Sequence, residues 1–126
     1  MTQVKRTASV VINGRNVAVE WTDAAARELA RRPRPLVVEL ELYFSCLIKK
    51  FVHFREEAGE RQTVAASDKL LLYFRPVTST ACSLEVAERL GRQPEMELHG
   101  EAVARIAPKT VSIDYARGSW QGRYSL

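Results

Sequence analysis

Residues 36–55 constrain the fold more than any other part of this chain, because apolar and polar side chains alternate along them. Successive side chains of a β-strand point to opposite faces, so the alternation predicts a strand with one face in a core and the other toward water. The apolar face comprises Val38, Leu40, Leu42, Phe44, Cys46, Ile48, Val52 and Phe54, and the polar face comprises Glu39, Glu41, Tyr43, Ser45, Lys49, His53 and Arg55. This pattern is typical of an antiparallel sheet.

The same segment is too long to run straight. Its 20 residues would span roughly 65 Å at about 3.3 Å per residue, whereas a domain of this size is only about 35 Å across. The strand must therefore bend or break. We expect the break at Lys49-Lys50, where the apolar alternation stops.

Length and composition predict one domain that spans residues 1–126. Hydrophobic residues make up 46% and charged residues 27% of the chain, which is the balance of a soluble globular protein. The apolar runs are far shorter than the roughly 20 residues of a membrane helix, and we find no signal-peptide pattern. We therefore expect a cytoplasmic protein that does not enter a membrane, with Cys46 and Cys82 as free thiols.

The rest of the chain predicts further strands and short helices. Asn13-Gly14 predicts that the chain opens with a β-hairpin, because both turn residues tolerate positive φ. Thr22 is the expected N-cap of a first helix, which Pro33 ends. Besides residues 36–55, the expected strands are residues 7–12, 15–21, 68–75, 95–99, 102–106, 109–115 and 119–125. The expected helices are residues 24–32 and 84–90. Residues 56–67 are expected to form a loop, and Pro76 is expected to end the strand that precedes it. This order predicts an α+β fold, with a mostly antiparallel sheet and two short helices.

Three segments follow one known pattern: Val19–Leu29, where a strand leads through Thr-Asp into the first helix, then Leu70–Pro76, and Val111–Tyr115 with its Asp-Tyr ending. In this order they resemble the HesB/IscA family of A-type iron–sulfur carriers. The resemblance implies that Cys46 stands for the first of the family's ligand cysteines, although the neighbouring glycines and the C-terminal Cys-Gly-Cys are missing. The resemblance therefore implies a scaffold that has lost cluster binding and that carries no cofactor. A hairpin, a helix and a strand also open the β-grasp fold, but the Gly-Gly tail of its sulfur-carrier members is missing.

Few side chains predict chemistry. Cys46 is the candidate metal ligand, yet its place on the apolar face predicts burial. Cys82 precedes the helix expected at residues 84–90, and thiols near helix N-termini can be activated, so it is the candidate reactive thiol, with packing as the alternative. Glu39 and Glu41 share the polar face, where they form either an acid pair or a solvated surface. The histidines, His53 and His99, lack the spacing of metal ligands, and we expect both at the surface.

A basic and aromatic set offers a binding function. The net charge is +4, and the basic excess lies toward the two ends of the chain. The candidate contacts for nucleic acid or an acidic partner are Lys49, Lys50, Phe51, His53, Arg55, Arg75, Arg117, Trp120, Arg123 and Tyr124. We expect a non-enzymatic binding or accessory domain with a protein partner, or a homodimer through sheet edges. The alternative is a protein that binds nucleic acid weakly through charge.

Overall fold

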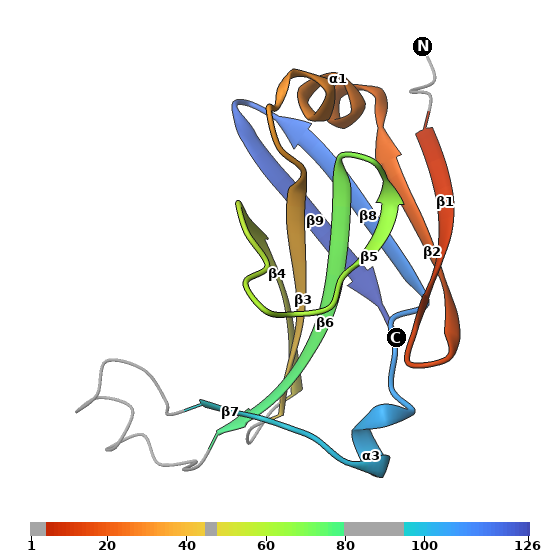
Figure 1. Cartoon of the computed structure of the whole chain (residues 1–126), viewed down its shortest axis with the longest axis vertical. Helices are drawn as coiled ribbons and strands as arrows, with labels where there is room; N and C mark the ends of the chain where they lie inside the picture. Colours follow the sequence, from red (N-terminus) through yellow and green to blue (C-terminus); the bar gives the residue numbers. More distant parts are fainter. Residues whose placement is uncertain (1–4, 45–47, 80–94) are drawn as a thin grey trace, which may run out of the picture.

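The computed structural model describes residues 5–44, 48–79 and 95–126 (Figure 1). The elements are β1 (Lys5–Ile12), β2 (Arg15–Thr22), α1 (Asp23–Arg31), β3 (Leu36–Phe44), β4 (Ile48–Arg55), β5 (Val64–Ser67), β6 (Leu70–Ser79), β7 (Glu95–Glu97), α3 (Glu101–Ala104), β8 (Thr110–Ala116) and β9 (Ser119–Ser125). The predicted α+β class is wrong. Strands dominate the described residues, and the fold is mainly β.

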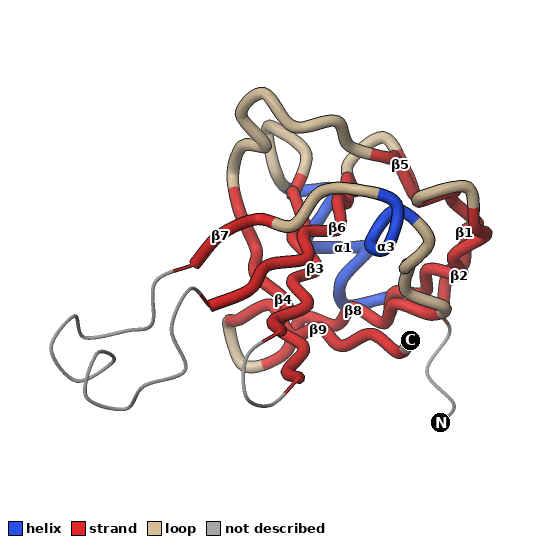
Figure 2. The backbone as a smooth tube through the Cα atoms, turned by 90° about the horizontal axis from the view of Figure 1, so that it is seen from below, coloured by secondary structure: helices blue, strands red, loops and turns tan. Residues whose placement is uncertain are grey.

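The strands form two sheets. Sheet A has the order β1-β2-β8-β9, and sheet B has the order β4-β3-β6-β5, with β7 on the far end of β6. Neighbouring strands are antiparallel except at β2-β8 and β3-β6, which are parallel. The sheets approach each other at β4 and β9 and again at β1 and β5. Seen from below, β7 and the loop to α3 cross the end of the molecule (Figure 2).

The opening hairpin and the first helix are confirmed. Asn13 and Gly14 have φ values of 52° and 74°, and Ile12 pairs with Arg15. The side chain of Thr22 accepts a hydrogen bond of 3.2 Å from the backbone N–H of Ala25, as expected of an N-cap. α1 therefore begins directly at the end of β2 and lies at one end of the molecule, against β2 and β8 (Figure 1).

We predict that Gly14→Val lowers the free energy of unfolding by about 1–2 kcal/mol, because a β-branched residue is strained at positive φ. A β-carbon at this position meets no atom within 4 Å, so the cost comes from backbone strain alone. Gly14→Asn is the matched control, since Asn tolerates this conformation, and it should cost clearly less. Urea unfolding followed by circular dichroism measures both. Equal effects of the two substitutions would show that the turn conformation is not the cause.

The long alternating segment is a hairpin and not one bent strand. β3 ends at Phe44 and β4 begins at Ile48, so the break precedes the predicted one at Lys49-Lys50. The return places Val38 opposite Phe54 and Leu40 opposite Val52, which puts the apolar side chains of both strands on one face. Cys46 lies outside the described residues.

β6 is a central strand, as predicted, but it continues through Pro76 to Ser79. The N–H and C=O of a strand residue point to the same side. The carbonyl of Pro76 accepts a 2.8 Å hydrogen bond from the N–H of Leu98, so the missing N–H of Pro76 lies on the same side as β5 and β7. On that side β5 pairs with residues 70–72 of β6, and β7 pairs with residues 77–79. No described strand residue therefore pairs with Pro76 there. The proline therefore costs no ladder hydrogen bond.

Other predicted elements differ or fall outside the described residues. The strand expected at residues 102–106 is wrong, because α3 occupies Glu101–Ala104, where glutamate and two alanines favour a helix. Residues 64–67 of the expected loop form β5. The helix expected at residues 84–90 and Cys82 lie outside the described residues.

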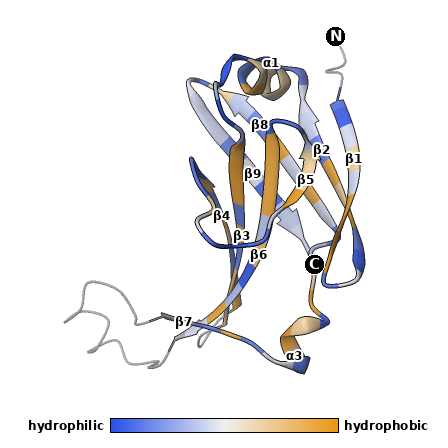
Figure 3. Ribbon diagram, in the orientation of Figure 1, coloured by the Kyte–Doolittle hydropathy of each residue, from blue (hydrophilic) through white to orange (hydrophobic). Residues whose placement is uncertain are grey.

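The core lies between the inner faces of the two sheets. Its buried side chains include Val17, Val19, Val111 and Ile113 from sheet A, Leu36, Val38, Leu40, Leu70 and Leu72 from sheet B, and Ala25 and Leu29 from α1. The most hydrophobic parts of β3 and β6 lie at the centre of sheet B (Figure 3). No helix of the described residues has the length and apolar character needed to cross a membrane.

Candidate functional site

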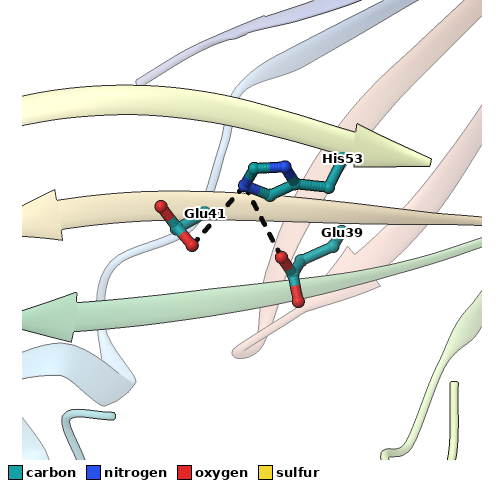
Figure 4. A group of neighbouring side chains, drawn as sticks. All are labelled: Glu39, Glu41 and His53. Atoms are coloured by element: carbon teal, nitrogen blue, oxygen red, sulfur yellow. Dashed lines mark ion pairs between the residues drawn. The ribbon is translucent and has the colours of Figure 1, made fainter. Parts of the chain in front are cut away.

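Glu39, Glu41 and His53 converge on the outer face of sheet B (Figure 4). His53 on β4 is directly opposite Glu39 on β3, and Glu41 is two residues further along the same face of β3. Nε2 of His53 lies 3.7 Å from Oε2 of Glu39 and 3.6 Å from Oε1 of Glu41. One donor atom from each residue lies within 4.8 Å of the other two. We call these three residues the Glu-Glu-His cluster.

The two carboxylates of the cluster are buried. Glu39 is 3% exposed and Glu41 is 6% exposed, so the expectation of a solvated acidic face is wrong. The side chain of His53 is 39% exposed and gives the cluster its contact with solvent. Burial of an ionised carboxylate is costly unless hydrogen bonds and opposite charges compensate it. The neighbouring side chains supply this compensation.

Glu39 accepts two side-chain hydrogen bonds. Tyr73 donates to its Oε1 at 2.5 Å, and Nη2 of Arg55 donates to its Oε2 at 3.2 Å. Burial raises the pKa of Glu39, but the hydrogen bonds from Tyr73 and Arg55, together with nearby positive charge, outweigh burial and leave that pKa below its usual value. Burial, together with the hydrogen bond to Glu39, raises the pKa of Tyr73 to about 12. At neutral pH Glu39 is therefore an anion and Tyr73 its protonated donor.

Glu41 belongs to a chain of alternating charges. Nη1 of Arg75 lies 3.2 Å from its Oε1, and Nε of Arg75 donates to Glu97 on β7 at 3.2 Å. Glu97 also pairs with Arg61 at 2.6 Å. The guanidinium of Arg61 lies over the ring of Tyr73, 5.1 Å from its centroid. The loop after β4 and strand β7 thus extend the network over the face that carries the buried carboxylates.

The donor set of the cluster suits a divalent transition metal ion. Imidazole nitrogen and carboxylate oxygen both bind zinc, at about 2.0–2.2 Å, and tetrahedral geometry then separates two ligand atoms by about 3.4 Å. The observed separations of 3.6 and 3.7 Å are close to this value. The same contacts also describe an ion-pair network that joins β4, β3 and β6. Metal binding is the property that distinguishes the two interpretations.

The basic and aromatic candidates lie in different surroundings. Arg55 and Arg75 lie in the network of the buried carboxylates. Tyr124 is buried and its hydroxyl donates to the backbone carbonyl of Glu41, while Trp120 packs against Tyr115, with 4.9 Å between ring centroids. His53 belongs to the Glu-Glu-His cluster, and the remaining candidates, Lys49, Lys50, Phe51, Arg117 and Arg123, are exposed.

A polar cleft of about 370 Å³ lies on sheet A, and Arg123 and Lys5 contribute to its lining. Its polar groups pair with one another. Ser112 donates to Glu20 at 2.7 Å, and Thr22 donates to Asp114 at 2.5 Å. The hydrogen bond from Ser112 is the main cause that lowers the pKa of Glu20. The residues that line this cleft include no histidine or cysteine to join Glu20 and Asp114, so it is a weaker candidate for a metal site than the Glu-Glu-His cluster.

Sequence reasoning noted the acid pair of Glu39 and Glu41 but did not join it to His53. The missing information was the pairing of β3 with β4. Once Phe44 is paired with Ile48, the register sets His53 opposite Glu39, and alternation puts Glu41 on the same face. Cys46 and Cys82, the candidate metal ligand and reactive thiol, lie outside the described residues.

Comparison with known proteins gives no family to guide the assignment: no family model matches the chain, and no curated protein or solved structure matches it. The resemblance to A-type iron–sulfur carriers stays a prediction. The function must be inferred from the geometry.

Proposed function

We propose that this protein binds a divalent transition metal ion, zinc in the first instance, through Glu39, Glu41 and His53. The observation that carries the proposal is the convergence of Nε2 of His53 on two buried carboxylate oxygens at 3.6 and 3.7 Å. Nitrogen and oxygen ligands without sulfur favour zinc and its neighbours in the first transition row over softer ions. The proposal includes a cytoplasmic location and the role of a binding or accessory domain, in keeping with the composition.

Three protein ligands leave at least one coordination position of a zinc ion open. The partly exposed imidazole of His53 supports an opening of this position toward solvent, since both carboxylates are buried beneath it. The outer partners of the carboxylates also suit a metal site. Tyr73 and Arg55 fix the orientation of Glu39, and Arg75 does the same for Glu41. Such outer hydrogen bonds commonly hold metal ligands in place.

Isothermal titration of the metal-free chain with zinc chloride tests the proposal. We expect one zinc ion per chain, and His53→Ala should weaken zinc binding by at least about 10-fold, the loss that even outer-sphere mutations can cause. His99→Ala is the matched control, because His99 is the one other histidine of the chain and its side chain is 80% exposed. It should leave zinc binding unchanged.

Two results would contradict the proposal. One is the absence of zinc binding by the folded chain. The other is zinc binding that survives His53→Ala and is lost in Cys46→Ser or Cys82→Ser, which would assign the metal to a thiol.

A further inference from the structure

We infer that the zinc-loaded cluster takes an oxyanion, such as phosphate, as a further ligand, held jointly by the metal and Arg55. This inference rests on the proposed metal binding. It follows from the charge balance of the site and from the position of Arg55 beside the metal-binding atoms.

The ion pairs described around the cluster join three carboxylates to three guanidinium groups. The carboxylates of Glu39, Glu41 and Glu97 match the guanidinium groups of Arg55, Arg61 and Arg75, through the ion pairs that join them. A divalent ion bound by the neutral imidazole of His53 would add two positive charges to this set. An uncompensated charge next to buried groups is costly, so the loaded site favours an anion.

The geometry selects Arg55 as the protein group that would hold this anion. Its Nη2 lies 3.2 Å from Oε2 of Glu39, the same oxygen that faces His53. A metal on that oxygen would therefore have a guanidinium beside it. The side chain of Arg55 is 50% exposed, whereas that of Arg75 is 20% exposed, so Arg55 has more freedom to turn its donors toward an incoming ligand.

The chemistry of both partners favours an oxyanion over a halide. A guanidinium presents parallel N–H donors that match two oxygens of a phosphate or carboxylate. A zinc ion with an open position accepts an oxygen ligand from the same group. One oxyanion can thus bridge the metal and Arg55, which a spherical chloride ion cannot do with the same bidentate geometry.

Titration of the full-length chain, loaded with one equivalent of zinc, with inorganic phosphate tests the inference. We expect phosphate to bind the zinc-loaded chain and not the metal-free chain. By linkage, phosphate should raise the affinity for zinc by at least about fivefold, with sodium chloride at matched ionic strength as the control. Arg55→Ala should also weaken zinc binding itself, because it removes a hydrogen bond to Glu39, so the test is the ratio of the zinc affinities with and without phosphate, which should fall to one in this variant.

Two further variants complete the test. Arg55→Lys keeps the charge without the bidentate donors and should retain only part of the enhancement. Arg34→Ala is the matched control, because Arg34 forms an exposed pair with Glu57, and it should keep the full enhancement. Thermal unfolding by circular dichroism confirms that each variant is folded.

The possible failures are distinguishable. Zinc binding that is independent of phosphate overturns this inference and leaves the proposed function intact. Phosphate binding of equal strength without zinc also overturns it, because the site would then be an anion site of the metal-free chain. A chain that binds no zinc overturns both proposals.

Discussion

Gly122→Val should lower the free energy of unfolding by about 2–3 kcal/mol, because β9 approaches β4 too closely for a side chain at this position. A β-carbon on Gly122 would lie 2.9 Å from Cγ1 of Val52 and 3.0 Å from Cζ of Phe54. The first distance is shorter than real β-carbon contacts and the second is tighter than most of them, so the side chains of Val52 and Phe54 would have to move away from β9. Urea unfolding at equilibrium measures the loss.

Gln121→Val is the matched control for this prediction. Gln121 is the preceding residue of β9 and is exposed, so the same side chain added there meets no core atom. We expect it to change the free energy of unfolding by no more than about 0.5 kcal/mol. If Gly122→Val also stays within this range, β4 and β9 do not pack as described.

Leu40→Ala should cause the largest loss of stability, about 3–5 kcal/mol, because it leaves a cavity between the two sheets. Leu40 is fully buried at the centre of β3, between β4 and β6, and belongs to the common core cluster. The loss would be a large share of the 5–15 kcal/mol that is typical of a domain. Denaturant unfolding of wild type and variant at one temperature gives the difference.

Val11→Ala is the control for core burial, since Val11 lies in a strand but is 55% exposed. We expect an effect within about 0.5 kcal/mol. Similar losses from Val11→Ala and Leu40→Ala would contradict a core that is centred on the inner face of sheet B.

Short sequence patterns correctly predicted the turn and the helix start whose conformations depend mainly on neighbouring residues. Asn13-Gly14 defined a hairpin because its residues accept positive φ, and Thr22 defined the start of α1 because its hydroxyl caps the helix. The alternation of residues 36–55 also identified Val38, Leu40 and Leu42 as core side chains. It failed for Ile48, which it assigned to the core face but which is 64% exposed.

Tertiary pairing decided the features that the sequence did not predict. β3 ends at Phe44 and β4 begins at Ile48, and the sequence between them, Ser45-Cys46-Leu47, has no glycine, asparagine or proline to signal a turn. Pro76 remains inside β6 because no strand among the described residues pairs with it on the side of its nitrogen, and this depends on where β5 and β7 stop pairing. The parallel pairs β2-β8 and β3-β6 join segments far apart in the chain and leave no local signal.

The candidate site also combines features that the sequence predicts with features that depend on strand pairing. Alternation placed Glu39, Glu41 and His53 on one face of the segment, but their convergence depends on the register of β3 and β4. A shift of one residue would turn the imidazole to the opposite face. The burial of the two carboxylates depends further on Tyr73 and Arg75 from β6, which pair with β3 in parallel. Sequence patterns could therefore identify the ligand types but not the site.

Nitrogen-15 NMR of the histidine side chains tests the central claim most directly, because the chain has only two histidines, His53 and His99. On addition of one equivalent of zinc, the account predicts a large shift of the Nε2 resonance of His53, with both resonances of His99 unchanged. Unchanged resonances of His53 in the presence of zinc, with the chain folded, would contradict a metal site at the Glu-Glu-His cluster.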